Sequence, residues 1–157
     1  MIVVMTSVEF VTMIDRQWAP DVLRMMRALY EADGQEHRVD AETFPSTIDY
    51  LLANPASGRI VLLTDGGVLH GYALLVSYWS NEWGGVVLLL DELFVDEAFR
   101  GRGIAKAFFR HLERERPFGA VVVALEVSSR NTRARALYES MGFTDRHLRT
   151  MTRRLTA

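Results

Sequence analysis

The chain has 157 residues, of which 49% are hydrophobic, so it has the length of one ordinary domain and can build a packed core. Its 18 basic and 20 acidic residues give a formal net charge of -2, which does not fit a nucleic-acid-binding protein, whose positive charge is clustered. No cysteine is present, which excludes disulfides, thiolate metal sites and a cysteine nucleophile.

The longest apolar runs are shorter than a membrane span, so we expect a cytoplasmic protein without a membrane partner. Its four histidines are scattered without the spacing of metal ligands, so we expect no metal site. We find no internal repeat, low-complexity tract or linker, and therefore predict a single domain over residues 1–157.

The first half of the chain predicts two helices followed by a hairpin. Apolar residues at helical spacing predict a helix over 16–31, and residues 40–52 predict a second helix. An Asp65-Gly66-Gly67 turn joins two apolar runs, 59–64 and 68–78, and so predicts a β-hairpin.

The second half alternates strands with helices. The almost wholly apolar run 86–95 predicts a central strand that is covered on both faces. The elements predicted after it are a helix over 101–116, a buried strand over 120–127, a short helix over 132–141 capped by Gly142, and one or two closing strands within 143–155. This order predicts a three-layer α/β arrangement around one sheet.

The segment between that central strand and the next helix carries the clearest chemical signal. Gly101 and Gly103 stand at the helix start, where glycine permits positive φ and lets several N–H groups point inward together. The helix dipole adds partial positive charge there, so an anionic pyrophosphate is a suitable ligand. From the residues alone a plain strand-to-helix turn is favoured, because glycine turns are common, and the Gly-Lys-Ser/Thr ending of a Walker A loop is absent.

Arg100-x-x-Gly103-x-Ala105 resembles the Arg/Gln-x-x-Gly-x-Gly/Ala signature of the GNAT superfamily of acetyltransferases. Downstream, Leu125-Glu-Val127 followed by Asn131-x-x-Ala134-x-x-Leu137-Tyr138-Glu139-x-x-Gly142-Phe143 resembles that family's second signature. The resemblance covers roughly residues 59–155. It implies a single α/β domain with a mixed, mostly antiparallel sheet, a splayed parallel strand pair, and helices on both faces.

The resemblance also implies acetyl-CoA as cosubstrate, bound where the two parallel strands separate. The backbone of 93–95 would hold the pantetheine arm, main-chain N–H groups of 101–106 the pyrophosphate, and Asn131 the pantetheine or the nearby phosphates. The implied cofactor-binding residues are Leu93, Phe94, Val95, Arg100, Gly101, Arg102, Gly103, Ile104, Ala105, Lys106 and Asn131.

Acetylation of an amine needs a base for the ammonium proton and an acid for the departing thiolate. From spacing alone its apolar neighbours favour a core tyrosine, but Tyr138 matches the family's tyrosine and is therefore the candidate acid. Asp91 is the first candidate base, at a position where diamine acetyltransferases carry a glutamate that is one carbon longer. Glu126 is the second, at the position of the base in ribosomal-protein alanine acetyltransferases. Strand alternation predicts that Asp91 and Glu92 point to opposite faces, so that only one of them faces the reacting centre.

The resemblance therefore implies direct transfer from acetyl-CoA to a primary amine of a small molecule, such as a diamine, a polyamine or an amino-acid-like acceptor. No covalent acetyl-enzyme is expected, because no cysteine exists to carry it. Two alternatives stay open: acetylation of a protein N-terminus or lysine, and a non-catalytic acyl-CoA-binding module. A homodimer is among the assemblies compatible with this interpretation.

Overall fold

The computed structural model describes residues 7–33, 39–147 and 149–155. The chain forms two compact units, Met1–Glu126 and Val127–Ala157. Within the described part of the chain, no helix combines the length and the apolar character needed to cross a membrane.

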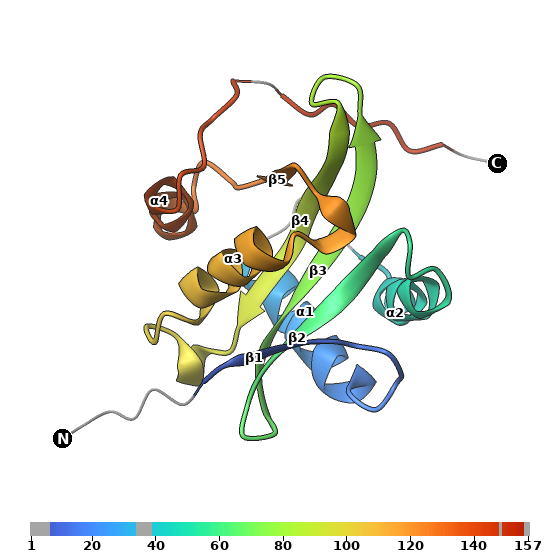
Figure 1. The fold of residues 1–157 in the computed structure, drawn as a ribbon. Helices are drawn as coiled ribbons and strands as arrows, with labels where there is room; N and C mark the ends of the chain where they lie inside the picture. Colours follow the sequence, from blue (N-terminus) through green and yellow to red (C-terminus); the bar gives the residue numbers. More distant parts are fainter. Residues whose placement is uncertain (1–6, 34–38, 148, 156–157) are drawn as a thin grey trace. The chain divides into compact units, whose positions relative to one another are not determined.

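The first unit is built around a five-stranded sheet with the strand order β1-β2-β3-β4-β5 (Figure 1). Neighbouring strands are antiparallel except β4 and β5, which are parallel. The strands are β1 (Glu9–Thr12), β2 (Gly58–Asp65), β3 (Val68–Ser80), β4 (Gly85–Val95) and β5 (Val122–Leu125). The predicted α/β class, mixed sheet and parallel pair are therefore confirmed, whereas the edge strand β1 was not predicted.

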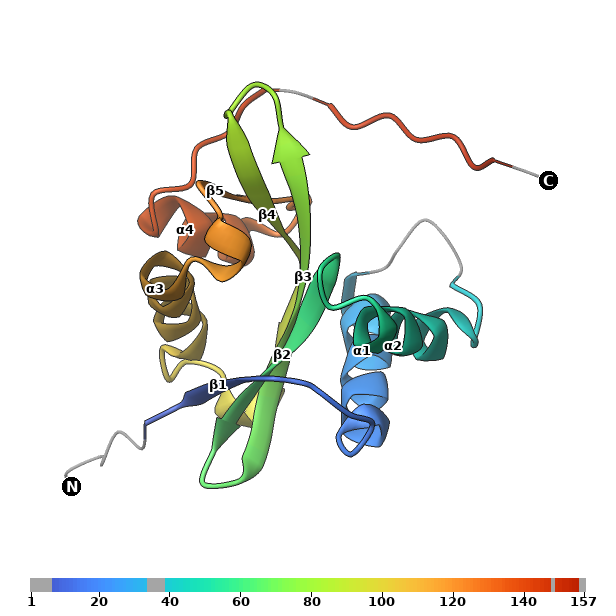
Figure 2. The same ribbon diagram turned by 45° about the vertical axis from the view of Figure 1, so that its right-hand side comes forward.

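Helices cover both faces of this sheet, as Figure 2 shows. α1 (Ala19–Asp33) and α2 (Thr43–Ala53) lie on one face, and α3 (Ile104–Glu115) lies on the other. α3 is strongly amphipathic, and it buries Ile104, Phe108, Phe109 and Leu112 against the sheet side. On the opposite face, the core under α1 and α2 consists of residues such as Val22, Met25, Met26, Phe44, Ile48, Ile60, Leu62, Tyr72, Leu74 and Phe94. This burial of apolar surface is the main stabilising contribution to the unit.

β4 contains a bulge at Asp91. Its neighbours pair regularly with β3, Glu92 opposite Leu74 and Leu90 opposite Leu75, so Asp91 is an extra residue without a partner of its own. A bulge of this kind bends the strand and re-aims side chains.

The parallel pairing ends next to the same bulge. β4 and β5 pair from Val87 with Val122 as far as Leu90 with Leu125, and β4 then continues to Val95 without β5. The predicted separation of the two parallel strands therefore begins at Asp91 on β4 and Glu126 after β5.

The second unit contains α4 (Thr132–Ser140). The side chain of Asn131 caps its N-terminus by accepting a hydrogen bond from the Ala134 N–H at 3.1 Å. Gly142 follows the helix with φ +88°, which confirms the predicted left-handed position. The closing strands predicted within 143–155 were wrong for the described residues, because 143–147 and 149–155 form no strand. The unit offers no described strand for them to pair with.

Candidate active site

The turn before α3 has the backbone that an anion site needs. Gly101 and Gly103 have φ of +76° and +78°, and a Cβ built on either meets nothing within 4 Å. Gly103 is the N-cap of α3 and offers no side-chain hydrogen bond to the helix. The first helical bond runs from the Ala107 N–H to the Gly103 carbonyl at 2.9 Å, so the N–H groups of the first turn precede it and have no helical acceptor. The open space and these donors fit a pyrophosphate group.

The arginine side chains of this turn bind it to the preceding segment. Arg100 donates from Nε to the Val95 carbonyl at 2.8 Å, and its guanidinium carbon lies 5.6 Å from the centre of the Phe94 ring. Its own N–H donates to Glu97 at 3.2 Å, and so is already used. Arg102 donates from Nη2 to the Ala98 carbonyl at 3.1 Å. Arg100 was predicted to bind the cofactor, but its main-chain N–H is occupied by this hydrogen bond within the chain.

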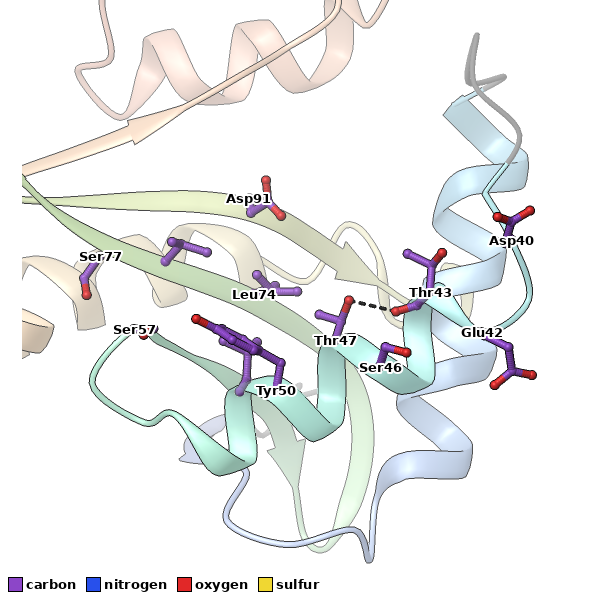
Figure 3. Close-up of a pocket in the computed structure, with 12 residues that line it drawn as sticks. Asp40, Glu42, Thr43, Ser46, Thr47, Tyr50, Ser57, Leu74, Ser77 and Asp91 are labelled. Atoms are coloured by element: carbon purple, nitrogen blue, oxygen red, sulfur yellow. Dashed lines mark hydrogen bonds between the residues drawn. The ribbon is translucent and has the colours of Figure 1, made fainter. Parts of the chain in front are cut away.

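A pocket of about 650 Å³ lies on the α1/α2 side of the sheet, with Asp91 in its β4 wall (Figure 3). α2 contributes hydroxyl groups at helical spacing, from Thr43, Ser46, Thr47 and Tyr50. The other lining residues are Asp40, Glu42, Leu51, Ser57, Leu74, Val76 and Ser77. Three of the described residues that line it are carboxylates and none is basic, so the pocket suits a cationic ligand with hydrogen-bonding groups.

The two candidate bases, Asp91 and Glu126, are electrostatic neighbours. Desolvation raises the pKa of the Asp91 carboxyl above its ordinary value, and the charge of Glu126 raises this pKa further. Asp91 is nevertheless exposed, because it lies in the wall of an open pocket. A carboxylate with a raised pKa is a stronger base than a free aspartate, which suits removal of a proton from an amine.

The prediction that Asp91 and Glu92 point to opposite faces was wrong. Asp91 lines the pocket beside α2, while Glu92 is buried and accepts a hydrogen bond from the Tyr72 hydroxyl at 2.7 Å. Tyr30 of α1 also hydrogen-bonds to Glu92. Both acids therefore lie on the α1/α2 side, because the bulge at Asp91 interrupts the alternation of the strand.

Glu92 has the environment of an anchoring residue. Burial raises the pKa of its carboxyl, and the hydrogen bonds from Tyr72 and Tyr30 only partly oppose this shift. Burial and the Glu92 carboxylate together raise the pKa of the Tyr72 hydroxyl. Glu92 is not among the residues that line the pocket, and its hydrogen bonds to Tyr72 and Tyr30 anchor β4 to β3 and α1.

Comparison with known proteins identifies the family. A model of the acetyltransferase (GNAT) family matches residues 21–143. The chain belongs to the GNAT family of acetyltransferases. GNAT enzymes use acetyl-CoA, which is therefore the cosubstrate of this chain. No curated protein matches this GNAT sequence.

Solved structures share the GNAT fold at low sequence identity. A possible acetyltransferase from Clostridium difficile 630 is 19% identical with a TM-score of 0.81, and the match covers 96% of this chain and 99% of that one. An aminoglycoside N-acetyltransferase solved in complex with CoA is 18% identical with a TM-score of 0.77, covering 98% and 99%. A Trypanosoma brucei acetyltransferase is 24% identical with a TM-score of 0.68, covering 95% and 100%. At such identities these similarities establish the fold alone.

Two predicted GNAT site residues belong to the second unit. Tyr138 lies on α4, half-buried, with its ring 5.9 Å from the ring of Phe143. Asn131 uses its side-chain oxygen to cap α4. Their predicted roles toward acetyl-CoA stay predictions.

The polar residues of α2 were missed by the sequence analysis. Thr43, Ser46, Thr47 and Tyr50 are spaced by three, four and seven positions, which puts their hydroxyl groups on one face of a helix. That spacing was the available signal for the pocket beside Asp91. Among the described residues, no group of three His, Asp or Glu side chains could hold a metal ion.

Proposed function

We propose that this GNAT enzyme is an N-acetyltransferase that acetylates a primary amine of a small cationic molecule, such as a diamine, a polyamine or an amino-acid-like acceptor. The observation that carries the proposal is the acidic pocket beside Asp91, whose volume of about 650 Å³ suits a small molecule. Its carboxylates and hydroxyls attract and orient an ammonium group, and no described lining residue repels one.

The proposed binding of acetyl-CoA uses the turn and the free part of β4. Acetyl-CoA supplies the acetyl group as an activated thioester. The first-turn N–H groups of α3 and the backbone at Gly101 and Gly103 would hold its pyrophosphate, with Lys106 and Arg102 adding positive charge. Because β5 no longer pairs with β4 beyond Leu90, the backbone of 93–95 has an edge that can bind the pantetheine arm. Asn131 would add a contact from the second unit.

The proposed proton transfers involve two residues. Asp91 accepts a proton from the acceptor ammonium, directly or through one water, which frees the nitrogen lone pair. The nitrogen then bonds to the acetyl carbon while the carbon–sulfur bond breaks and leaves the thiolate of CoA. Tyr138 donates its hydroxyl proton to that thiolate. The acceptor nitrogen gives up a second proton as the amide forms, and the Tyr138 phenolate accepts it, so the net products are the amide, the thiol of CoA and one proton held by Asp91.

The main alternative is acetylation of a protein N-terminus or lysine with Glu126 as the base. Its support is the position of Glu126, which directly follows the last paired residue of β5 and acts electrostatically on Asp91.

We also propose that both units form one acetyltransferase domain, because the family match at 21–143 crosses their boundary. The proposed location of the enzyme is the cytoplasm. A homodimer is the assembly to be tested by light scattering.

The deciding experiment measures CoA thiol release from acetyl-CoA with a panel of acceptors. The panel contains diamines, polyamines, free amino acids, aminoglycosides and peptides with free N-termini. The proposal predicts the highest kcat/KM for a small acceptor with more than one cationic group. Preference for the peptides would support the alternative, and CoA binding without turnover on any acceptor would support a non-catalytic module.

A further inference from the structure

The segment between β4 and the glycine turn packs against one buried residue of β3, His70. His70 is 6% exposed, and its imidazole stacks on the ring of Phe99, with centroids 3.7 Å apart and planes 10° apart. Phe99 is the last residue of η1, a short helix over Glu97–Phe99 that leads directly into Arg100 and Gly101. The stack therefore lies immediately before the proposed pyrophosphate turn.

The backbone of β3 is built to present this ring. Leu63 pairs with Gly71, and Thr64 pairs with Leu69, so His70 is the extra residue of a second bulge. The His70 carbonyl accepts the Asp96 N–H at 2.8 Å, which fixes the start of the segment on the same residue whose ring supports its end. Bulges re-aim side chains in this way and often lie next to functional sites.

Hydrogen bonding does not hold the imidazole in place at Nδ1. This atom is buried and has no hydrogen-bond partner among the described residues. An unpaired buried polar atom is unfavourable for folding, and the stack on Phe99 is a favourable contact that helps to position the ring. Asp96 adds two further contacts, by capping Ala98 at 3.3 Å and by pairing with Arg24 of α1 at 3.4 Å.

Phe99 also contacts Arg102, a residue of the glycine turn. The guanidinium carbon of Arg102 lies 5.3 Å from the centre of the Phe99 ring, while Arg102 also donates to the Ala98 carbonyl. A shift of Phe99 would move both Arg102 and the backbone between the two glycines. Convergent N–H groups bind an anion well only when their directions are fixed in advance.

We propose that His70 is a positioning residue for acetyl-CoA, which acts through Phe99 to hold the Arg100–Lys106 turn in its binding geometry. The inference rests on the proposed binding of CoA at this turn. His70 lies on β3, outside both sequence signatures, so the proposal gives a residue of β3 a role in cofactor affinity.

The test compares His70→Ala with His70→Phe by calorimetric titration with CoA. His70→Ala removes the stack and should raise the Kd for CoA at least tenfold, and it should raise the KM for acetyl-CoA with kcat at saturation unchanged. His70→Phe keeps an aromatic ring on Phe99 and should restore the Kd to within about twofold of the wild type. Leu62→Ala is the matched control: it truncates a residue of the core under α1 and α2, and should lower the melting temperature without changing the Kd.

Three results would overturn the inference: an unchanged Kd in His70→Ala, no rescue by His70→Phe, or an equal loss of affinity in Leu62→Ala. If His70→Ala does not fold, His70→Leu keeps the volume without the ring and is expected to show the same loss of affinity. Failure of the wild-type protein to bind CoA would instead refute the proposed turn. The two failures are therefore distinguishable.

Discussion

Asp91 and Glu126 occupy matching places on neighbouring strands, because each directly follows a member of the last parallel pair, Leu90 and Leu125. The charge of Glu126 raises the pKa of Asp91 across the point where the strands separate. The two residues that the sequence offers as competing bases are therefore coupled. Substitution of Asp91 alone and of Glu126 alone should therefore change the pH dependence of turnover in different ways.

Asp91→Asn should reduce turnover about 100-fold or more near neutral pH, because the substrate amine then arrives protonated and has no base. The loss should shrink as the pH approaches the amine pKa of about 10, since the free amine no longer needs deprotonation. The measurement is the pH profile of kcat/KM on the best acceptor, with CoA binding checked in parallel. A deficit that stays constant across pH would remove Asp91 from the role of base.

Glu126→Gln serves as the matched charge-neutral substitution on the other strand. It should leave neutral-pH turnover largely intact and shift the acid limb of the kcat/KM profile to lower pH. The sign follows from the repulsion: without the Glu126 charge the pKa of Asp91 falls, so Asp91 stays deprotonated in more acidic solution. Alkaline rescue in Glu126→Gln, together with none in Asp91→Asn, would exchange their roles and favour peptide N-termini as acceptors.

Gly103→Val should abolish the rise in melting temperature that CoA produces, because a side chain would project into the open space before α3 and the backbone φ of +78° would be strained. Gly67→Val is a control with nearly the same strain, since Gly67 has φ +79° in the hairpin turn with nothing nearby. Both variants should lose stability without ligand, and only Gly103→Val should lose the CoA response. A normal response in Gly103→Val would show that the turn does not bind the cofactor.

Tyr138→Phe should slow turnover at saturating acceptor while leaving the Kd for CoA nearly unchanged, because only the departing thiolate needs the hydroxyl proton. The ring contact with Phe143 does not involve the hydroxyl and should persist. Single-turnover measurements separate the chemical step from product release. Wild-type rates in that assay would leave Tyr138 as a packing residue.

Glu92 should make the protein less stable as the pH rises. Its pKa in the folded state is raised above the ordinary 4.5, so between these two values the folded state binds more protons than the unfolded state, and stability falls with increasing pH. Urea unfolding of the wild type and Glu92→Gln at several pH values isolates this slope, because the variant lacks it.

Tyr72→Phe extends the same experiment. It removes a hydrogen bond that lowers the pKa of Glu92, so the loss of stability with rising pH should continue to higher pH than in the wild type. It should also cost about 1–3 kcal/mol of stability near neutral pH, because a buried carboxylate loses a donor. Parallel slopes for the wild type and Glu92→Gln would contradict the assignment of this slope to Glu92.

Most of the fold could be predicted because periodicity and turn residues are local. The hairpin at Asp65–Gly67, the apolar strand β4 and the amphipathic helix α3 all follow patterns of a few residues. β1 escaped prediction because its short sequence, Glu9-Phe-Val-Thr12, carries little periodic signal. One or two closing strands were predicted within 143–155, but a strand requires a pairing partner, which local sequence does not specify.

The candidate site was predictable only in part for the same reason. Gly101 and Gly103 stand in a contiguous motif, and their positive φ follows from the turn they make. The pocket proposed for the acceptor instead joins α2 to β3 and β4, whose residues are far apart in the chain. The faces of the sheet on which Asp91 and Glu92 lie depend on a bulge. This bulge arises from the pairing of β4 with β3 and cannot be recognised in the sequence of β4 alone.

The extra residue at Asp91 also sets how β4 can be engineered. Before it, the side chain that shares a face with Val76 is odd-numbered, Leu89, and after it the side chains facing Leu74 and Tyr72 are even-numbered, Glu92 and Phe94. A mutant library that assumes strict odd–even alternation along the whole of β4 would assign side chains to the wrong face of the sheet on one side of Asp91. Deletion of one residue here would restore regular alternation of side chains along the whole of β4. The acidic side chain at the pocket wall and the buried anchor beneath it could then no longer share a face.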